Sequence, residues 1–312
     1  MKLLFGCGYL GSRVARLWRD RGEAVTIVTR KPTKAAELSA EGYRAIVADV
    51  CDHATLVDLP PAETVLFAVG YERGAAATAA SAKPIEEVYA GGLSNVLNKL
   101  RSNLPAHSPL PIPHSAFTSP LVIYISSTGV YADAEGDWVD EETPARPIRE
   151  GGRACLAAEQ VLAGHPLGVR SIVLRPAGIY GPQRIPRAET LRRGEPIDAP
   201  PDGFLNLIHV DDLARIVCDV ERLAHGGEIA LPRTFNVADG HPVVRREYYR
   251  ELARLLDAPP PRFVESKQVC QAVLRAAADK RIATSRLTSE VAPNFAYPSF
   301  REGLAAIVAS YK

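Results

Sequence analysis

Short apolar runs alternate with stretches of helical periodicity along most of the chain. The apolar runs predict buried strands at residues 2–5, 24–28, 44–48, 65–69, 121–125, 171–174 and 234–237. Apolar positions at helical spacing predict helices at residues 12–18, 88–100, 152–163 and 211–223. Strands that alternate with helices are typical of a doubly wound parallel sheet, so we expect an α/β fold.

The alternation becomes weaker after residue 182. Residues 183–205 are rich in Pro, Arg and Gly, and helices and loops are expected to fill much of the chain after residue 238. We therefore predict a larger domain of residues 1–182 plus 206–238 and a smaller, discontinuous C-terminal lobe of residues 183–205 plus 239–312. A chain of 312 residues suits this division.

Charge and composition narrow the class of protein. The chain has 37 Lys and Arg against 36 Asp and Glu. It therefore lacks the excess of positive charge that binds nucleic acid or an anionic membrane surface. No apolar run approaches the roughly 18 residues of a membrane span. We expect neither a nucleic-acid partner nor a membrane partner.

The cysteines and the acidic residues give no sign of a disulfide framework or a metal site. Five cysteines are scattered along the chain and never form a C-x-x-C pair, at positions 7, 51, 155, 218 and 270. No group of His, Asp and Glu has metal-ligand spacing, so we predict no metal. The first residues lack the pattern of a secretory signal, and we expect a cytoplasmic protein.

A glycine-rich turn joins the first strand to the first helix. Gly6, Gly8 and Gly11 form the pattern G-x-G-x-x-G, with Tyr9 and Leu10 between the second and third glycines. In this context the first glycine permits a tight turn, the second lets the backbone approach a pyrophosphate, and the third lets the helix pack against the strand. The amides of the helix N-terminus then bind phosphate. The alternative is a glycine-rich turn without a ligand.

Basic residues follow the second strand. An acidic residue at that point binds the ribose hydroxyls of NAD, whereas an arginine suits the 2′-phosphate of NADP. Arg30, with Lys31 beside it, therefore favours NADP, and NAD is the alternative cofactor. A solvated basic turn is the structural alternative.

Other candidate cofactor contacts follow the later strands. Asp49, next to Val50, is expected either to accept a hydrogen bond from the adenine amino group or to cap the following loop. The remaining candidates are Ala68, Val69 and Gly70 after the fourth strand and Arg175 and Pro176 at the end of the sixth.

With these segments placed, the chain resembles the extended short-chain dehydrogenase/reductase superfamily, and within it the NAD(P)-dependent epimerase/dehydratase group. The segments that carry the resemblance, besides the glycine turn, are S-S-T-G-V-Y at 126–131, L-R-P-A-G-I-Y-G-P at 174–182, N-L-I-H-V-D-D at 206–212 and F-N-V-A-D-G at 235–240. The glycine pattern matches an atypical branch of the group. The resemblance implies a Rossmann-type fold, a nicotinamide dinucleotide cofactor, and catalysis in which a serine, a tyrosine and a lysine assist hydride transfer.

The chain departs from the family at the tyrosine and the lysine. Ser127 occupies the serine position, but Gly151 stands where the family has its tyrosine and Cys155 where it has its lysine. Glycine has no proton to donate, and cysteine does not supply the fixed positive charge of lysine. The usual acid/base pair is missing.

Three residues are weighed as substitutes. Arg153 is a candidate for the missing positive charge; the alternative is a surface residue of its helix. Tyr131 is a candidate proton donor, and the alternative is a packing residue as in the family. Cys155 is more often a small apolar residue at such a position than a nucleophile. Ser127, Tyr131 and Arg153 are our catalytic candidates.

Residues outside this motif bear on the substrate. Trp138, Asp140 and Glu141 lie in a polar loop that contacts substrate or covers the site, and the His209-Val210-x-Asp212 segment is expected to be structural. The basic residues of the 183–205 segment favour an anionic substrate such as a nucleotide diphosphate, with solvated charge as the alternative; they are Arg184, Arg187, Arg192 and Arg193.

Two functions compete. The first is an NADP-dependent oxidoreductase that acts on a small or nucleotide-linked carbonyl compound with an altered acid/base. The second is a non-catalytic dinucleotide-binding sensor or partner-binding protein; an isomerase ranks lower because it needs the missing acid/base twice per cycle. The resemblance also implies a possible homodimer through the helices at 88–100 and 152–163.

Overall fold

The structure is a computed structural model that describes residues 1–71, 83–104, 119–264 and 279–311. The chain divides into two compact units. Unit 1 comprises residues 1–127, 150–174 and 214–234, and unit 2 comprises residues 128–149, 175–213 and 235–312. The predicted division differs from these units, because residues 128–149, 175–182, 206–213 and 235–238 are grouped with unit 2.

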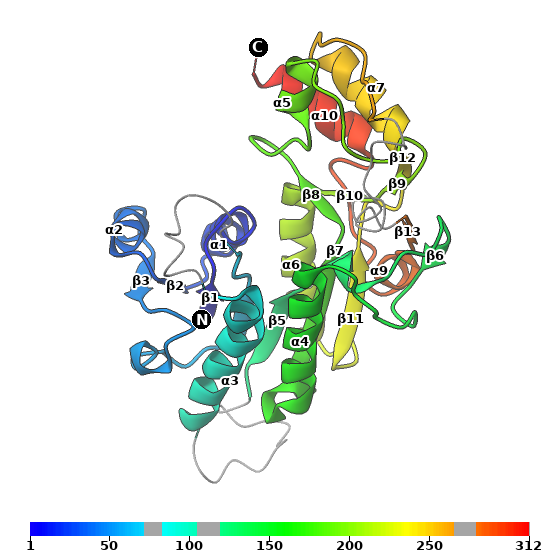
Figure 1. The fold of residues 1–312 in the computed structure, drawn as a ribbon. Helices are drawn as coiled ribbons and strands as arrows, with labels where there is room; N and C mark the ends of the chain where they lie inside the picture. Colours follow the sequence, from blue (N-terminus) through cyan, green and yellow to red (C-terminus); the bar gives the residue numbers. More distant parts are fainter. Residues whose placement is uncertain (72–82, 105–118, 265–278, 312) are drawn as a thin grey trace. The chain divides into compact units, whose positions relative to one another are not determined.

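The described residues form a seven-stranded sheet in the order β11-β7-β5-β4-β1-β2-β3 (Figure 1). Its strands are β1 (Lys2–Phe5), β2 (Val25–Thr29), β3 (Arg44–Val47), β4 (Thr64–Phe67), β5 (Leu121–Ile125), β7 (Ser171–Pro176) and β11 (Arg233–Val237). The five neighbouring pairs from β3 to β7 are all parallel. Strand order reverses direction at β1, as in a doubly wound sheet, and the predicted α/β fold is confirmed.

Helices connect the strands of unit 1. They are α1 (Gly11–Asp20), α2 (Pro32–Ala40), α3 (Gly92–Ser102), α4 (Glu150–Gly164) and α6 (Val210–His225), with short turns η1 (His53–Thr55), η2 (Glu87–Gly91) and η4 (Pro166–Arg170). Of α6, residues 214–225 belong to unit 1. The helix predicted at 88–100 differs at its start, because residues 87–91 form a π-helical turn before α3.

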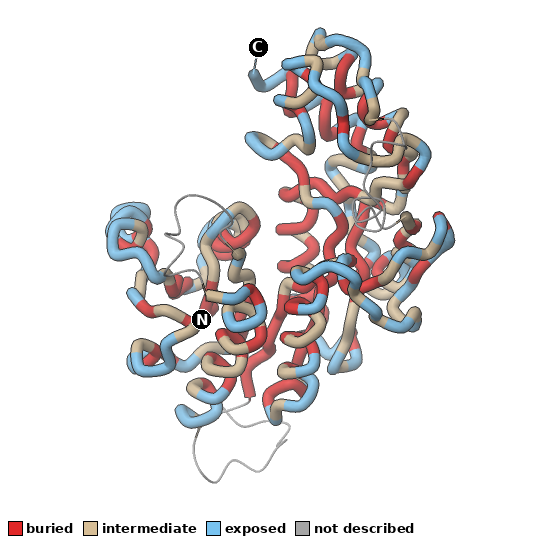
Figure 2. The backbone as a smooth tube through the Cα atoms, viewed as in Figure 1, coloured by how far each residue is buried: buried red, intermediate tan, exposed pale blue. Residues whose placement is uncertain are grey.

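The two faces of the sheet in unit 1 are covered by different helices. Alternate strand residues point to opposite faces, and Leu3 and Phe67 pack with Leu93 and Val96 of α3 and with apolar residues of α4. On the opposite face, a Cβ at Gly11 of α1 would contact the Leu4 side chain. Strands and inner helix faces are buried, as Figure 2 shows.

A buried carboxylate joins three elements of unit 1. Glu221 of α6 accepts hydrogen bonds from Trp18 Nε1 of α1 and from Thr64 Oγ1 of β4, each at 2.6 Å. The ammonium of Lys2 on β1 lies 2.8 Å from the same carboxylate. A buried charge with this many partners is satisfied and ties α6 to the other elements.

Unit 2 contains short strands and helices. They are η3 (Thr128–Val130), β6 (Trp138–Val139), β8 (Gly178–Tyr180), α5 (Ala188–Arg192), β9 (Phe204–Leu205), β10 (Leu207–His209), β12 (Val243–Val244), α7 (Arg245–Leu255), β13 (Arg281–Ile282), α9 (Ser285–Glu290) and α10 (Phe300–Ala309). The described strands pair as β8 with β10, β9 with β12, and β6 with β13. Tyr180, Tyr248 and Leu304 belong to the apolar core of this unit.

Two further findings concern the described residues as a whole. No helix in these ranges has the length and apolar character needed to cross a bilayer. Cys7, Cys51, Cys155 and Cys218 are free thiols, and Cys270 lies outside the described residues.

Candidate functional site

The glycine turn of unit 1 lies where neighbouring parallel strands end. Phe5 of β1 is paired with Phe67 of β4, so the residues after them meet at one edge of the sheet. Ala68 N–H donates to the Phe5 carbonyl at 2.8 Å. Gly6 has φ of +93°, and a Cβ there would lie 2.4 Å from the Ala68 carbonyl oxygen. The structure therefore brings Gly6 and Ala68 together, and only glycine fits at position 6.

The second and third glycines of the motif have different surroundings. A Cβ at Gly11 would lie 2.2 Å from the Gly6 carbonyl oxygen, so packing of α1 on the turn requires this glycine. A Cβ at Gly8 meets no described atom within 4 Å, and Gly8 is exposed. Packing within the described chain explains Gly6 and Gly11 but not Gly8.

The residues between these glycines support the turn. Leu10 is the N-cap of α1, is 7% exposed, and provides no side-chain cap. The Arg13 guanidinium lies 4.4 Å from the centre of the Tyr9 ring and donates to the Tyr9 carbonyl at 2.7 Å. The N-terminus of α1 thus has no capping side chain, which leaves it suited to an anion.

The residues that follow β2 and β4 are largely accessible to solvent. Arg30 and Lys31 are exposed, and Lys31 is the N-cap of α2 without a side-chain cap. Val69 is half-buried, and Gly70 is exposed, with no described atom within 4 Å of the place that a Cβ would take. These positions are accessible, as a cofactor-binding role requires.

Asp49 caps the loop after β3. Its Oδ1 accepts the Cys51 N–H at 2.9 Å, and its Oδ2 lies 3.9 Å from Lys83 Nζ. Val50 is buried, and its carbonyl accepts a hydrogen bond from Asn95. These bonds favour the loop-capping alternative for Asp49 over the contact with adenine.

Two consecutive serines follow β5 and differ in environment. Ser126 is buried, and its Oγ donates to Glu159 Oε1 of α4 at 2.5 Å. Ser127 is half-buried. Sequence reasoning missed the role of Glu159, which holds the Ser126 hydroxyl.

Helix α4 contains Gly151 and Cys155, the two positions at which the family's tyrosine and lysine are expected. Cys155 is 6% exposed, and burial raises the pKa of its thiol to about 11, so the thiol is neutral near pH 7. Gly151 is half-buried and Arg153 is exposed on the same helix. The neutral, buried thiol supplies no positive charge and is a poor nucleophile.

Tyr131 lies in unit 2, in a buried polar network. It is 2% exposed; its hydroxyl accepts from Arg175 Nη1 and donates to Asn236 Oδ1, both at 2.8 Å. Burial raises the pKa of the phenol, although Arg175 acts in the opposite direction. The Glu141 carboxylate accepts the Asn236 N–H at 2.7 Å and so extends the network. This environment favours the packing alternative for Tyr131 and opposes its expected role as proton donor.

The expected residues around this network also have structural partners. Arg175 is 8% exposed, and the Pro176 carbonyl accepts a hydrogen bond from Thr128 Oγ1 at 3.4 Å. Trp138 is 53% exposed and lies beside the Arg281 guanidinium, while Asp140 caps the turn to Thr143. Glu141 is the member of the predicted polar loop that reaches the buried network.

Buried ionisable groups of unit 2 have shifted pKa values. Burial raises the pKa of Asp239 to about 7, and the Asp212 carboxylate adds to this shift. Burial lowers the pKa of Lys280 to about 8, and its ammonium donates to the Tyr131 carbonyl at 3.1 Å. Asp212 accepts the backbone N–H groups of Ala296 and Tyr297 at 2.8 and 3.0 Å, which supports the structural role predicted for its segment.

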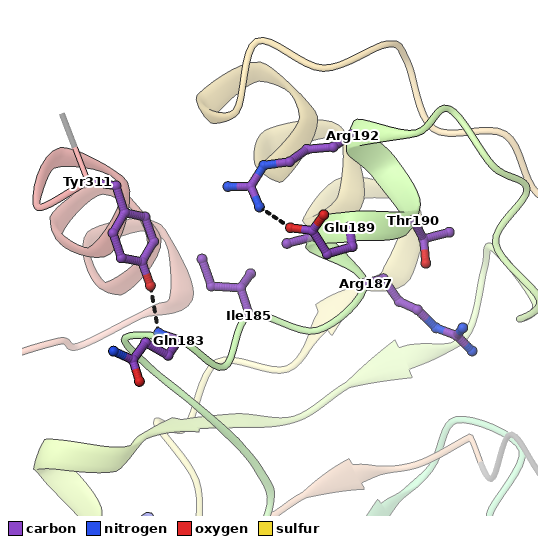
Figure 3. Close-up of a pocket in the computed structure, with 8 residues that line it drawn as sticks. Gln183, Ile185, Arg187, Glu189, Thr190, Arg192 and Tyr311 are labelled. Carbon is purple, nitrogen blue, oxygen red and sulfur yellow. Dashed lines mark hydrogen bonds and ion pairs between the residues drawn. The ribbon is translucent and has the colours of Figure 1, made fainter. Parts of the chain in front are cut away.

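A cavity of about 440 Å³ lies in unit 2 beside α5 (Figure 3). Tyr311 bounds it on one side, where its hydroxyl accepts the Gln183 N–H at 2.6 Å. Arg192 forms an ion pair with Glu189, and the Arg187 side chain points away from Tyr311. Of the four predicted arginines, Arg187 and Arg192 line the cavity.

The side chains that usually bind metals are dispersed in the described ranges. No group of three or more His, Cys, Asp and Glu side chains there is placed to hold a metal ion.

Comparisons with known proteins cover most of the chain. The sequence model described as "NAD dependent epimerase/dehydratase family" matches residues 3–238. Protein YeeZ of Escherichia coli (strain K12) is 29% identical over 303 residues, which are 95% of this chain and 95% of that protein. Short-chain dehydrogenase/reductase family 42E member 1 of Macaca fascicularis is 26% identical over 272 residues, which are 79% of this chain and 65% of that protein.

The fold is similar to that of solved structures. MoeE5 in complex with UDP-glucose and NAD superposes with a TM-score of 0.69 at 21% identity, over 99% of this chain and 97% of that chain. At this identity the likeness concerns the fold alone.

Proposed function

Because the chain belongs to the NAD-dependent epimerase/dehydratase family, we propose that it is an NADP-dependent oxidoreductase. The family match and the short-chain dehydrogenase/reductase relative confirm the resemblance predicted from the motifs. The proposed reaction is hydride transfer between the nicotinamide ring and a small or nucleotide-linked carbonyl compound. The acid/base of this reaction differs from the usual tyrosine–lysine pair.

The open surroundings of Gly8 are the main support for the proposal that the protein binds a dinucleotide cofactor. A side chain at Gly8 meets no described neighbour, whereas Gly6 and Gly11 are needed for packing. A glycine that the chain itself does not require is explained by a ligand whose pyrophosphate approaches the backbone. The N-terminus of α1, which no side chain caps, lies next to it in the sequence.

Ser127 is the proposed substrate-binding group of the catalytic site. A bound nicotinamide supplies or accepts the hydride. Ser127 follows β5, is half-buried and donates to the substrate oxygen, whereas Ser126 is held by Glu159 and so positions its neighbour. We assign Tyr131 a positioning role, since its hydroxyl is already hydrogen-bonded to Arg175 and Asn236.

Without a phenol to protonate it, the substrate oxygen needs another proton source. Arg153 is exposed on α4 and is the proposed positive charge beside the ribose, and the proton then comes from solvent. The arginines at the cavity of unit 2, Arg187 and Arg192, support an anionic substrate.

Ser127→Ala tests the catalytic claim. Oxidation of NADPH with a panel of carbonyl compounds should fall by about 100-fold or more, because the substrate oxygen loses its donor. NADPH binding should remain as in the wild type. Ser102→Ala on α3 is the matched control, whose hydroxyl donates to the Lys99 carbonyl. Turnover that is equal in Ser127→Ala and the wild type would exclude this role.

A non-catalytic dinucleotide-binding protein is the second candidate. Gly151 and the neutral, buried Cys155 favour it, since both positions lack the usual chemistry. This candidate predicts cofactor binding without turnover on any carbonyl compound of the panel. Steady turnover by the wild type would eliminate it.

A further inference from the structure

A small cavity lies between α1 and α2 of unit 1, next to the glycine turn. Its volume is about 170 Å³. Cys7 of the turn, Ser12 and Arg16 of α1 and Lys34 of α2 contribute to its lining. All of these residues belong to unit 1, so one compact unit forms the cavity.

The lining of this α1–α2 pocket is cationic. It includes three basic side chains, Arg16, Arg19 and Lys34, against one acidic side chain, Glu41. Arg19 is occupied, because it donates to the Glu41 carbonyl at 3.0 Å and lies over the Tyr43 ring. An excess of positive charge in a pocket favours an anion.

The other two cations are available to a ligand. Arg16 is exposed and forms no hydrogen bond or ion pair with the described residues. Lys34 is half-buried and pairs at 2.9 Å with Glu37, whose side chain is 62% exposed; such a surface pair is weak. Ser12 adds a hydroxyl that donates to no described acceptor. A guanidinium, an ammonium and a hydroxyl together suit a phosphate group.

Two further features keep the pocket receptive to negative charge. The Cys7 thiol stays neutral, because burial raises its pKa to about 11. The first turn of α2 contains no acidic residue, and no side chain caps its N-terminus. The partial positive charge of that helix end therefore adds to the field of Lys34, which lies in the same turn.

We propose that the α1–α2 pocket binds the 2′-phosphate of NADP, with Lys34, Arg16 and Ser12 as its ligands. This inference rests on the proposed function. The cofactor ribose next to adenine lies between the glycine turn and the end of β2 in a dinucleotide-binding βαβ unit. Cys7 belongs to that turn and α2 begins three residues after β2 ends at Thr29, so the pocket borders the place of the 2′-oxygen. The preference for NADP over NAD is then determined by these three residues and not by Arg30 alone.

Calorimetric titration of Lys34→Gln and Arg16→Gln with NADPH and NADH tests the assignment. NADPH affinity should fall by about 10-fold or more in each variant, as expected for loss of a charge-assisted bond. NADH affinity should change by less than about 2-fold, since NADH lacks the phosphate. Lys99→Gln on α3 is the matched control and should bind both cofactors as the wild type does. Thermal melts establish that each variant is folded.

Competition with fragments identifies the source of the phosphate. Adenosine 2′,5′-bisphosphate should displace NADPH more strongly than adenosine 5′-phosphate, and Lys34→Gln should remove the difference. Inorganic phosphate that competes as well as the bisphosphate would overturn the assignment, because the pocket would then be a general anion site.

Other outcomes separate this inference from the proposed function. Suppose that the wild type prefers NADPH, that Arg30→Gln loses this preference, and that Lys34→Gln and Arg16→Gln keep it. This result would refute the assignment of the 2′-phosphate to the α1–α2 pocket and leave the NADP proposal intact. Equal wild-type affinity for NADPH and NADH would also overturn it and leave dinucleotide binding intact. A wild type that binds neither cofactor would overturn both.

Discussion

At the scale of single residues, the three glycines of one motif serve different needs. Gly6 and Gly11 are required by contacts within the chain, because an added Cβ would lie 2.4 Å and 2.2 Å, respectively, from a backbone oxygen, whereas Gly8 faces open space. Gly8 also lies outside the left-handed region of backbone conformation. Under the proposed function, a bound ligand requires Gly8 and the fold requires Gly6 and Gly11, so substitutions should separate the two effects.

Gly8→Ala should leave stability within about 0.5 kcal/mol of the wild type, because an added methyl meets no described atom. It should nevertheless weaken dinucleotide binding by blocking the approach of the pyrophosphate. Gly11→Ala should cost about 1–3 kcal/mol, since α1 must shift away from Gly6. Urea unfolding and cofactor titration of both variants provide the comparison; similar stability losses in both would refute it.

Asp239 makes unit 2 sensitive to pH. Its pKa is raised from 3.8 to about 7 by burial, and Oδ2 forms no hydrogen bond with the described residues. The folded state therefore holds a proton that the unfolded chain has lost between these values, so stability falls as pH rises from about 4 to 7. The groups that influence it are the His241 N–H, Asp212 and Glu302.

Asp239→Asn should remove this part of the pH dependence. An amide stays neutral, so near pH 8 the variant should be more stable than the wild type by about 2–4 kcal/mol, and near pH 4 the difference should disappear. Thermal melts from pH 4 to 8 measure both limits. A wild type whose melting temperature changes with pH in parallel with that of Asp239→Asn would contradict the shifted carboxyl.

At the scale of elements, one carboxylate joins α6 to α1, β1 and β4. Glu221 is 4% exposed and is contacted by Trp18, Thr64 and Lys2 at 2.6–2.8 Å. Its charge raises the pKa of Lys2 even though burial acts in the opposite direction. The stabilisation from Lys2 is present at neutral pH and is lost as pH rises through the raised pKa of its ammonium.

Glu221→Ala should destabilise the protein by about 3–5 kcal/mol, because the Trp18 indole N–H loses its acceptor and the buried Lys2 ammonium loses its shortest ion pair. Lys2 keeps only the longer pairs with Glu23 and Glu63, at 3.6 and 3.8 Å. Glu228→Ala is the matched control: its ion pair with Arg222 is exposed and should be worth less than about 1 kcal/mol. Urea unfolding distinguishes the two. Equal losses in both variants would show that the buried carboxylate is not an anchor.

The main strands and helices of unit 1 could be predicted from the sequence, and smaller elements could not. Continuous apolar runs such as Leu121–Ile125 are unambiguous because both faces of a parallel sheet are covered. The π-helical turn at Glu87–Gly91 has the same apolar spacing as an ordinary helix, so periodicity did not reveal it. Two-residue strands such as Trp138–Val139 depend on a partner far along the chain, here Arg281–Ile282.

At the scale of the whole molecule, the candidate site could be predicted only in part. Motif spacing predicts the glycine turn between β1 and α1, and the structure has this turn because its geometry is local. The roles predicted for the turn and for Ser127 stay predictions. The partners of Tyr131 lie 44 and 105 residues away along the chain, and no local pattern indicates them. The pocket at Arg16 and Lys34 was missed for the same reason, since it forms only when α1 and α2 lie next to each other.

The family match and the expected absence of the tyrosine–lysine pair together leave two candidate functions, one catalytic and one non-catalytic. The chain matches an NAD-dependent family over residues 3–238, and its motifs predict Gly151 and Cys155 at the positions of that family's tyrosine and lysine. The dimer expected through residues 88–100 and 152–163 stays a prediction. Both candidate functions require a bound dinucleotide, and they differ only in whether the bound cofactor then exchanges a hydride with a substrate.

Titration of the purified wild-type protein with NADPH and with NADH tests the central claim most directly. We expect one molecule of NADPH to bind per chain, more tightly than NADH, and Gly8→Ala to weaken this binding while the protein stays folded. A folded wild-type protein without affinity for either cofactor would contradict the account.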